Sequence, residues 1–232
     1  MSTVLITRPQ PDADRTAAEV QAHGFNPIVA PLMRIALRPH ALQDAPDCDA
    51  LAFTSANGVR AWRAAGGSVR PCYVVGPASA EAAREAGLPV AGVAEGDVET
   101  LAALIAKERP GRVLHVGGTA LAGDLTGRLS REGLPVQAIA LYEAVAETAL
   151  PPEARGAICA GLSFVLLFSP RSARLFCRLV REAGLQDELR NTRCAALSPA
   201  VAEAVDIPFA DVIVSDRRDL SGFVDILSAR RT

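Results

Sequence analysis

The sequence has few residues of the kinds that most often hold metals or form covalent intermediates. Its five cysteines include no CxxC pair, and its three histidines show no HxxxH or HxH spacing. Lys107 is the only lysine, and it lies late in an expected helix, so there is almost no candidate for a Schiff-base nucleophile. We therefore expect no metal and no organic cofactor.

Charge and hydropathy exclude further classes of protein. The net charge is −2 with 22% charged residues, so nucleic acid is not an obvious partner. No apolar run approaches the roughly 18 residues of a membrane span, and no basic segment precedes the first apolar run. Half of the residues are hydrophobic, which is enough for a packed core. Widely spaced cysteines are typical of a reducing compartment, so a cytoplasmic protein with no membrane partner is expected.

Nucleotide-binding motifs are also missing. Neither the G-x-G-x-x-G spacing nor a GxxxxGK[ST] motif occurs. The segment 117–123, Gly-Gly-Thr-Ala-Leu-Ala-Gly, is expected to follow a strand and open a helix, and Glu143 lies about 20 residues further on, as in dinucleotide sites. Without the glycine spacing, nucleotide binding is the weaker hypothesis.

What the chain does contain is an internal repeat. Three sets of blocks match at fixed offsets: 4–24 with 113–133 (113 − 4 = 109), 51–62 with 165–176 (165 − 51 = 114), and both 76–82 with 198–204 and 97–101 with 219–223 (198 − 76 = 122). A duplicated unit predicts two similar domains, and two facing domains make a cleft. A chain of 232 residues has room for two domains of about 100 residues each.

Each repeat alternates short apolar runs with longer alanine-rich runs. In the first copy this predicts a helix over 12–23 and strands over 4–6, 27–30, 51–53, 72–75 and 90–93. The second copy starts at Arg112, and its strand 136–141 is expected to end at Tyr142; linkers are expected over 34–49 and 143–162. The pattern predicts an α/β fold with doubly wound parallel sheets of flavodoxin-like type. It leaves open which blocks share a sheet.

Hydroxyl, proline and arginine residues recur at the expected strand-to-helix junctions: 7–9, 54–57, 76–79, 117–119, 169–172 and 198–199. Ligands of open α/β sheets bind at the carboxyl ends of the strands, where helix N-termini favour carboxylates or phosphates. Arg8 and Arg171 could add positive charge. A serine before a proline is also a favoured helix cap, which would explain Ser169 and Ser198 without a ligand. The six junctions together favour an anion-binding cleft.

Tyr142 is one of only two tyrosines. Its position where the chain leaves the second copy for a linker permits two interpretations. The phenol could donate a proton or a hydrogen bond into the cleft, or the ring could pack at a hinge between domains.

The segments 4–9, 53–61, 73–80, 141–145 and 168–170, in this order and spacing, resemble those of the uroporphyrinogen-III synthase family. The resemblance covers essentially the whole chain. It implies two flavodoxin-like domains joined by a two-stranded linker. Residues 1–33 and 148–232 would form the first, discontinuous domain and residues 34–147 the second, with the substrate cleft between them.

The resemblance also implies an activity. It is a cofactor-independent lyase of tetrapyrrole (haem) biosynthesis that closes linear hydroxymethylbilane to uroporphyrinogen III, with loss of water and inversion of the D ring. Loss of the hydroxyl gives an azafulvene, and attack at the substituted carbon of the last ring gives a spiro intermediate that fragments and recloses. The substrate is a polycarboxylate tetrapyrrole. A monomer is expected, with transient contact to the enzyme that supplies the substrate.

The family match makes Tyr142 the candidate acid for departure of the hydroxyl, and it places Ser55, Ser79 and Ser169 in the cleft. The junctions complete the expected substrate-binding set with Arg8, Asn57, Gly118, Thr119, Arg171 and Ser198. The chain departs from the family twice. Ser79 stands where threonine is frequent, and Ala200-Val201 stands where a threonine is common, so that only Ser198 and backbone N–H groups remain there.

Two interpretations from other classes remain. One is a cytoplasmic two-domain protein that binds an anion or another small molecule without catalysis. The other is a nucleotide-dependent transferase with two Rossmann-like domains, which the missing glycine pattern disfavours. Turnover of hydroxymethylbilane would separate the synthase from both.

Overall fold

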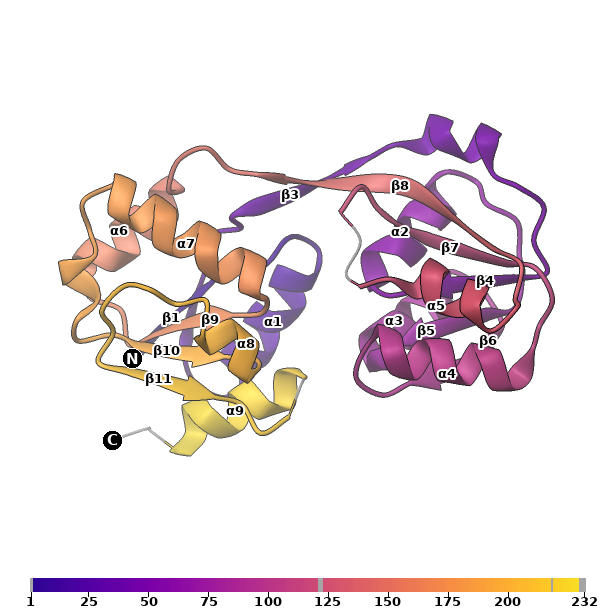
Figure 1. The fold of residues 1–232 in the computed structure, drawn as a ribbon. Helices are drawn as coiled ribbons and strands as arrows, with labels where there is room; N and C mark the ends of the chain where they lie inside the picture. Colours follow the sequence, from indigo (N-terminus) through magenta and orange to yellow (C-terminus); the bar gives the residue numbers. More distant parts are fainter. Residues whose placement is uncertain (1, 121–122, 218, 230–232) are drawn as a thin grey trace. The chain divides into compact units, whose positions relative to one another are not determined.

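The computed structural model describes residues 2–120, 123–217 and 219–229 (Figure 1). The chain divides into two compact units. Unit 1 consists of Met1–Arg34 together with Val145–Thr232, and unit 2 consists of Ile35–Ala144. Each unit is built on its own sheet, in which parallel strands pair. Along the chain, most strands are followed by a helix. The prediction of an α/β fold with parallel sheets is confirmed.

Unit 1 holds a five-stranded sheet in the order β11-β10-β9-β1-β2, with every pair parallel. Its strands are β1 (Thr3–Ile6), β2 (Asn26–Val29), β9 (Phe164–Leu167), β10 (Arg193–Ala196) and β11 (Asp211–Val214). Its helices are α1 (Asp12–Ala22), α6 (Pro152–Ala160), α7 (Pro170–Glu182), α8 (Pro199–Ala202) and α9 (Leu220–Ala229), with a 3₁₀ turn at Asp187–Leu189.

Helices cover both faces of the sheet of unit 1. Side chains of α1 and α9 share one apolar cluster with β1, β9 and β10, and Phe223 of α9 is fully buried in it. Helix α6 contacts β1 and β2, and α7 contacts β9; Figure 1 shows α6 and α7 along one side of the sheet and α9 along the other. All four residues of β9 are buried, as expected for a central strand covered on both faces.

Unit 2 holds a six-stranded sheet in the order β3-β8-β7-β4-β5-β6. Its strands are β3 (Met33–Leu37), β4 (Ala50–Phe53), β5 (Cys72–Val75), β6 (Val90–Ala94), β7 (Val113–Gly118) and β8 (Val136–Ala146). Its helices are α2 (Ala56–Ala64), α3 (Gly76–Glu85), α4 (Val98–Glu108) and α5 (Leu125–Arg131), with a 3₁₀ turn at Pro39–Asp44. One face of the sheet packs against α2 and α3, and the opposite face packs against α4 and α5.

Both expected linkers contain regular structure. The segment 34–49 includes most of β3 and a 3₁₀ turn, and the segment 143–162 includes the end of β8 and all of α6. β3 and β8 are neighbours in the sheet, and just past β3 the backbone N–H of Arg38 donates to the Leu141 carbonyl at 2.7 Å. Because this pairing keeps the chain extended, β8 continues to Ala146. The expectation that the strand ends at Tyr142 is therefore wrong.

The glycine-rich segment 117–123 does not open a helix, as had been expected. Strand β7 extends through Gly118, because Gly117 and Gly118 pair with Ala140 and Tyr142 of β8. Helix α5 begins only at Leu125, after its N-cap Asp124. Leu121 and Ala122 lie outside the described residues. Gly118 is thus the last residue of a strand and Thr119 comes directly after it, and neither lies at a helix N-terminus.

Within the described ranges, no helix has both the length and the apolar character that a membrane span requires.

Candidate functional site

The centre of the candidate site is a hydrogen bond between Ser55 and Tyr142 in unit 2. Ser55 follows β4 at the carboxyl edge of the sheet and is the N-cap of α2, while Tyr142 lies in β8. Their side-chain oxygens are 3.0 Å apart, and both residues are partly buried. A helix N-terminus beside a phenol suits both proton donation and anion binding.

The N-cap role of Ser55 leaves its hydroxyl proton available. The backbone N–H of Gly58 donates to Ser55 Oγ at 3.3 Å, and this bond uses one acceptor position of the hydroxyl. The single O–H of Ser55 can therefore point to the Tyr142 oxygen. With that donor in place, the Tyr142 proton can be given to a third group.

Tyr142 packs against the main chain at the end of β7. A Cβ atom at Gly118 would lie 2.8 Å from Tyr142 Cε2, so the ring occupies the space where a side chain would be. The backbone N–H of Thr119 donates to the Tyr142 carbonyl at 3.0 Å. Gly118 and Thr119 were expected at a helix N-terminus, but the structure places Gly118 at the end of β7 and Thr119 just past it, both against Tyr142.

Sequence reasoning missed the pairing of Thr54 with His115. His115 lies in β7 with none of its surface exposed, and its Nε2 is 3.5 Å from Thr54 Oγ1. Its Nδ1 is buried without a hydrogen-bond partner. Burial lowers the pKa of His115 from 6.5 to about 4, so the imidazole is neutral at pH 7. A lone histidine in an otherwise apolar strand was the only signal in the sequence.

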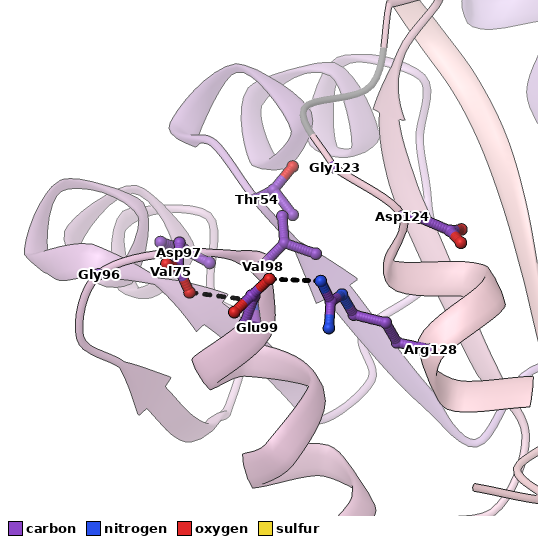
Figure 2. A pocket seen from close by; sticks show the side chains of 9 residues that line it. All are labelled: Thr54, Val75, Gly96, Asp97, Val98, Glu99, Gly123, Asp124 and Arg128. Carbon is purple, nitrogen blue, oxygen red and sulfur yellow. Dashed lines mark hydrogen bonds and ion pairs between the residues drawn. The ribbon is translucent and has the colours of Figure 1, made fainter. Parts of the chain in front are cut away.

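A cavity of about 400 Å³ opens on the α4 and α5 side of unit 2. Figure 2 shows the Glu99 carboxylate next to the Arg128 guanidinium in the lining of this cavity, and the two form an ion pair. The residues that line the cavity are Thr54, Val75, Gly96, Asp97, Val98, Glu99, Gly123, Asp124 and Arg128. Because this lining carries three carboxylates and one arginine, which is already paired, the cavity does not suit a polycarboxylate. We therefore do not assign it to the substrate.

The other expected residues of unit 2 have different surroundings. The Asn57 Oδ1 accepts a hydrogen bond from Arg60 Nη1 at 3.0 Å within α2. Ser79 lies in the first turn of α3 and is 4% exposed. Neither residue is brought to the Ser55–Tyr142 pair by a hydrogen bond in the described structure.

In unit 1, Arg8 follows β1 and is held on three sides. Its guanidinium lies 3.3 Å from Asp12 Oδ2, donates to Thr16 Oγ1 at 3.4 Å and stacks 4.4 Å from the centre of the Phe168 ring. About a quarter of its side chain, 26%, remains exposed. The arginine is thus fixed at the carboxyl edge with some surface open to a ligand.

The two expected serine caps of unit 1 differ. Ser169 forms a capping box with Ser172: its Oγ accepts from the Ser172 N–H at 3.1 Å. Ser169 is therefore the helix cap that a serine before a proline predicts. Ser198 stands at the N-cap position of α8, but its side chain makes no capping bond. Arg171 is exposed in the first turn of α7.

Cysteine and acidic side chains offer no further centre in the described part of the chain. All five cysteines are free. Desolvation raises the pKa of Cys177 to about 11 and that of Cys194 to about 12, so both thiols stay protonated and unreactive at neutral pH. Among the described residues, no three His, Cys, Asp or Glu side chains are grouped so that they could hold a metal ion.

Comparison with known proteins identifies the family. A family model described as uroporphyrinogen-III synthase HemD matches residues 14–225, which is most of the chain. The chain belongs to the uroporphyrinogen-III synthase family. No curated protein matches it in sequence. The activity is accordingly the cyclisation step of haem biosynthesis, and the substrate class of this family is a tetrapyrrole.

Solved structures of synthases share the fold. The chain is similar to uroporphyrinogen-III synthetase from Helicobacter pylori, with a TM-score of 0.61 and 16% identity over 99% of this chain and 100% of that one. It is also similar to a mutant uroporphyrinogen III synthase from the extremely thermophilic bacterium Thermus thermophilus, with a TM-score of 0.60 and 18% identity over 100% of this chain and 99% of that one. At this identity the likeness establishes the fold alone.

Proposed function

We propose that this member of the uroporphyrinogen-III synthase family uses the Tyr142 hydroxyl as the acid that assists loss of the substrate hydroxyl. The hydrogen bond between Ser55 and Tyr142 is the observation that carries the proposal. It pairs a phenolic proton donor with a second hydroxyl whose own proton is available. No metal is needed, because the leaving group departs as water once it is protonated.

In the proposed step, the C–O bond of hydroxymethylbilane breaks and its electron pair leaves with the oxygen. The phenolic proton of Tyr142 completes a water molecule, and the carbon left behind is the azafulvene carbon. Ser55 then donates its hydrogen bond to the phenolate oxygen, and the N-terminus of α2 adds favourable potential. On final ring closure the free α-carbon of the last ring loses its proton, and return of that proton to Tyr142 restores the site.

We further propose that both sheets bind the substrate at their carboxyl edges, where parallel α/β sheets bind ligands. Substrate carboxylates would meet Arg8, which keeps an exposed surface, and Arg171, which is exposed. Backbone N–H groups and hydroxyls at helix N-termini would add neutral donors, as at Ser198, whose side chain makes no capping bond. The remaining proposed contacts are Asn57, Ser79, Gly118, Thr119 and Ser169.

We also propose that the two units arose by duplication of one flavodoxin-like domain. The repeats pair β4, β5 and β6 with β9, β10 and β11, and they pair β7 and β8 with β1 and β2. With these equivalences the orders β6-β5-β4-β7-β8 and β11-β10-β9-β1-β2 become the same order. When the five strands of unit 1 are numbered 1 to 5 along the chain, their order across the sheet is 2-1-3-4-5, which is the flavodoxin-like order. Unit 2 would then be a circular permutation of unit 1 with β3 added at one edge.

Location and oligomeric state belong to the same proposal. Five free cysteines, three of them buried, are consistent with a reducing compartment, so we propose a cytoplasmic enzyme. A monomer is proposed as well. Contact with the enzyme that supplies the unstable substrate would be transient.

The test is turnover of hydroxymethylbilane by the purified chain, with the product oxidised and uroporphyrin I resolved from uroporphyrin III. Spontaneous closure in buffer provides the control and yields isomer I. Rapid formation of isomer III is expected. Formation of isomer I at the buffer rate would instead favour the binding protein without catalysis.

A further inference from the structure

We propose that Gly118 is a positioning residue for the Tyr142 hydroxyl, acting together with an irregularity in the neighbouring strand. The proposal rests on the role proposed for Tyr142 and explains how that side chain reaches Ser55. Three observations carry it: the side of the sheet on which Tyr142 lies, the shift in strand register beside it, and the space above Gly118.

Tyr142 lies on the side of the sheet opposite to the one that regular alternation would give it. Ile139 and Leu141 of β8 both pack in the cluster formed with α2 and α3, as residues two apart in a strand should. Tyr142 follows Leu141 directly, so it should face α4 and α5, yet it packs against the same cluster as Leu141. Two consecutive side chains therefore face α2.

A shift in register accounts for this. Gly117 pairs with Ala140, but Gly118 pairs with Tyr142, so Leu141 is an extra residue with no partner on β7. The Leu141 carbonyl instead accepts the Arg38 N–H on its other side. An inserted residue of this kind re-aims the side chain that follows it, and such bulges are frequent next to active sites. Here it turns Tyr142 toward the N-cap of α2.

In this orientation the Tyr142 ring occupies the space next to Gly118 where a side chain would otherwise lie. A Cβ atom there would lie 2.8 Å from Tyr142 Cε2 and 3.0 Å from Cζ, the atom that carries the hydroxyl. Carbon atoms in contact settle at about 3.5 Å or more, so any side chain at this position would push the ring away by roughly 0.5–0.7 Å. The bond to Ser55 is 3.0 Å long, and beyond about 3.5 Å it would no longer be a hydrogen bond.

Gly92 offers a matched control in the same sheet. It lies in β6 opposite Tyr73, the other tyrosine, and a Cβ atom at Gly92 would lie 3.0 Å from Tyr73 Cδ1 and 2.8 Å from Leu104 Cδ2. Gly92→Ala therefore makes a comparable clash against a tyrosine that has no proposed part in the reaction. Loss of packing alone would affect both variants equally.

The kinetic test is a double-mutant cycle on kcat with hydroxymethylbilane. Gly118→Ala is expected to lower kcat by about tenfold or more, up to but not beyond the loss caused by Tyr142→Phe. In the Tyr142→Phe background, the same glycine change should alter kcat by less than about twofold, because the hydroxyl it acts through is gone. Gly92→Ala should retain wild-type kcat. An equal loss from Gly118→Ala in both backgrounds would overturn the proposal.

A spectroscopic readout separates positioning from catalysis. Protein labelled with ¹³C at tyrosine Cζ gives two signals, which Tyr142→Phe assigns. Gly118→Ala should shift the Tyr142 signal in the same direction as Ser55→Ala does and leave the Tyr73 signal in place. Gly92→Ala should shift the Tyr73 signal and leave the Tyr142 signal in place. An unmoved Tyr142 signal in Gly118→Ala would show that the glycine does not position the hydroxyl. If Tyr142→Phe left the rate unchanged while these shifts occurred, the catalytic role would fail and the positioning would stand.

If Gly118→Ala does not fold, the double variant Gly118→Ala, Tyr142→Ala decides the matter. Removal of the ring removes the clash, so folding by circular dichroism should be restored. A double variant that stays unfolded while Tyr142→Ala alone folds would mean that Gly118 is required by the backbone of β7, which contradicts the proposal.

Discussion

Ser55 Oγ and Tyr142 Oη lie 3.0 Å apart, although 87 residues separate them along the chain. One oxygen belongs to the N-cap of a helix and the other to a strand two places away across the sheet, beyond β7. Their meeting depends on the order β8-β7-β4, which brings the carboxyl end of β4 close to β8.

Tyr142→Phe should lower the rate of uroporphyrinogen III formation while preserving the fold. The change removes one phenolic proton and keeps the ring above Gly118. General acid assistance contributes about 10²- to 10⁴-fold, and this leaving group departs readily, so we expect a loss at or below the low end of that range. Initial rates measure it, with circular dichroism as the folding control. The product should remain isomer III, and an unchanged rate would return Tyr142 to a packing role.

Ser55→Ala should lower both stability and rate. Stability should fall by about 0.5–2 kcal/mol, because α2 loses its N-cap. The rate should fall by less than for Tyr142→Phe, since the phenol remains and only its hydrogen-bond partner is lost. Urea denaturation and initial rates measure the two effects.

Asp124→Ala is the matched control for Ser55→Ala. Asp124 caps α5 by accepting the Gly127 N–H at 2.8 Å, and it has no contact with Tyr142 in the described hydrogen bonds. A comparable loss of stability with a wild-type rate is expected. Equal rate losses in the two variants would mean that loss of a helix cap, rather than the bond to Tyr142, slows Ser55→Ala.

Stability should fall with acidification partly through His115. Its pKa in the folded chain is about 4, below its ordinary value of 6.5, so the unfolded chain binds the proton more readily. The contribution is present in full above pH 6.5, decreases as the pH falls toward 4, and amounts to roughly 3 kcal/mol in total.

The check for His115 is the free energy of unfolding between pH 7 and pH 4.5 for the wild type and His115→Gln. The variant lacks the titrating group, so its stability should depend less steeply on pH over this interval. Parallel curves for the two proteins would show that other groups cause the acid sensitivity.

Exhaustive chelation and dialysis should leave activity unchanged. The spacing of the histidines and cysteines predicts no metal site, and the proposed proton donor is a tyrosine. Activity before and after treatment is the measurement, with elemental analysis of both samples. A stoichiometric transition metal whose removal abolished turnover would contradict this prediction.

The sequence alone determined the elements that depend on local physics. Strands such as β4 and β9 are short apolar runs next to helix-forming segments, and Ser169 before Pro170 is a cap that is readable from two residues. The order of similar segments was also enough to indicate the family, because it records ancestry rather than geometry.

Only the tertiary structure decided the environment of the candidate site. Whether Tyr142 ends a strand or continues it depends on pairing with β3 and β7, which are distant in sequence. Gly118 looked like part of an anion-binding turn, but it lies against the Tyr142 ring because one residue of β8 without a partner on β7 reverses the alternation. Register and side-chain facing are properties of strand pairs, so a single strand read alone cannot specify them.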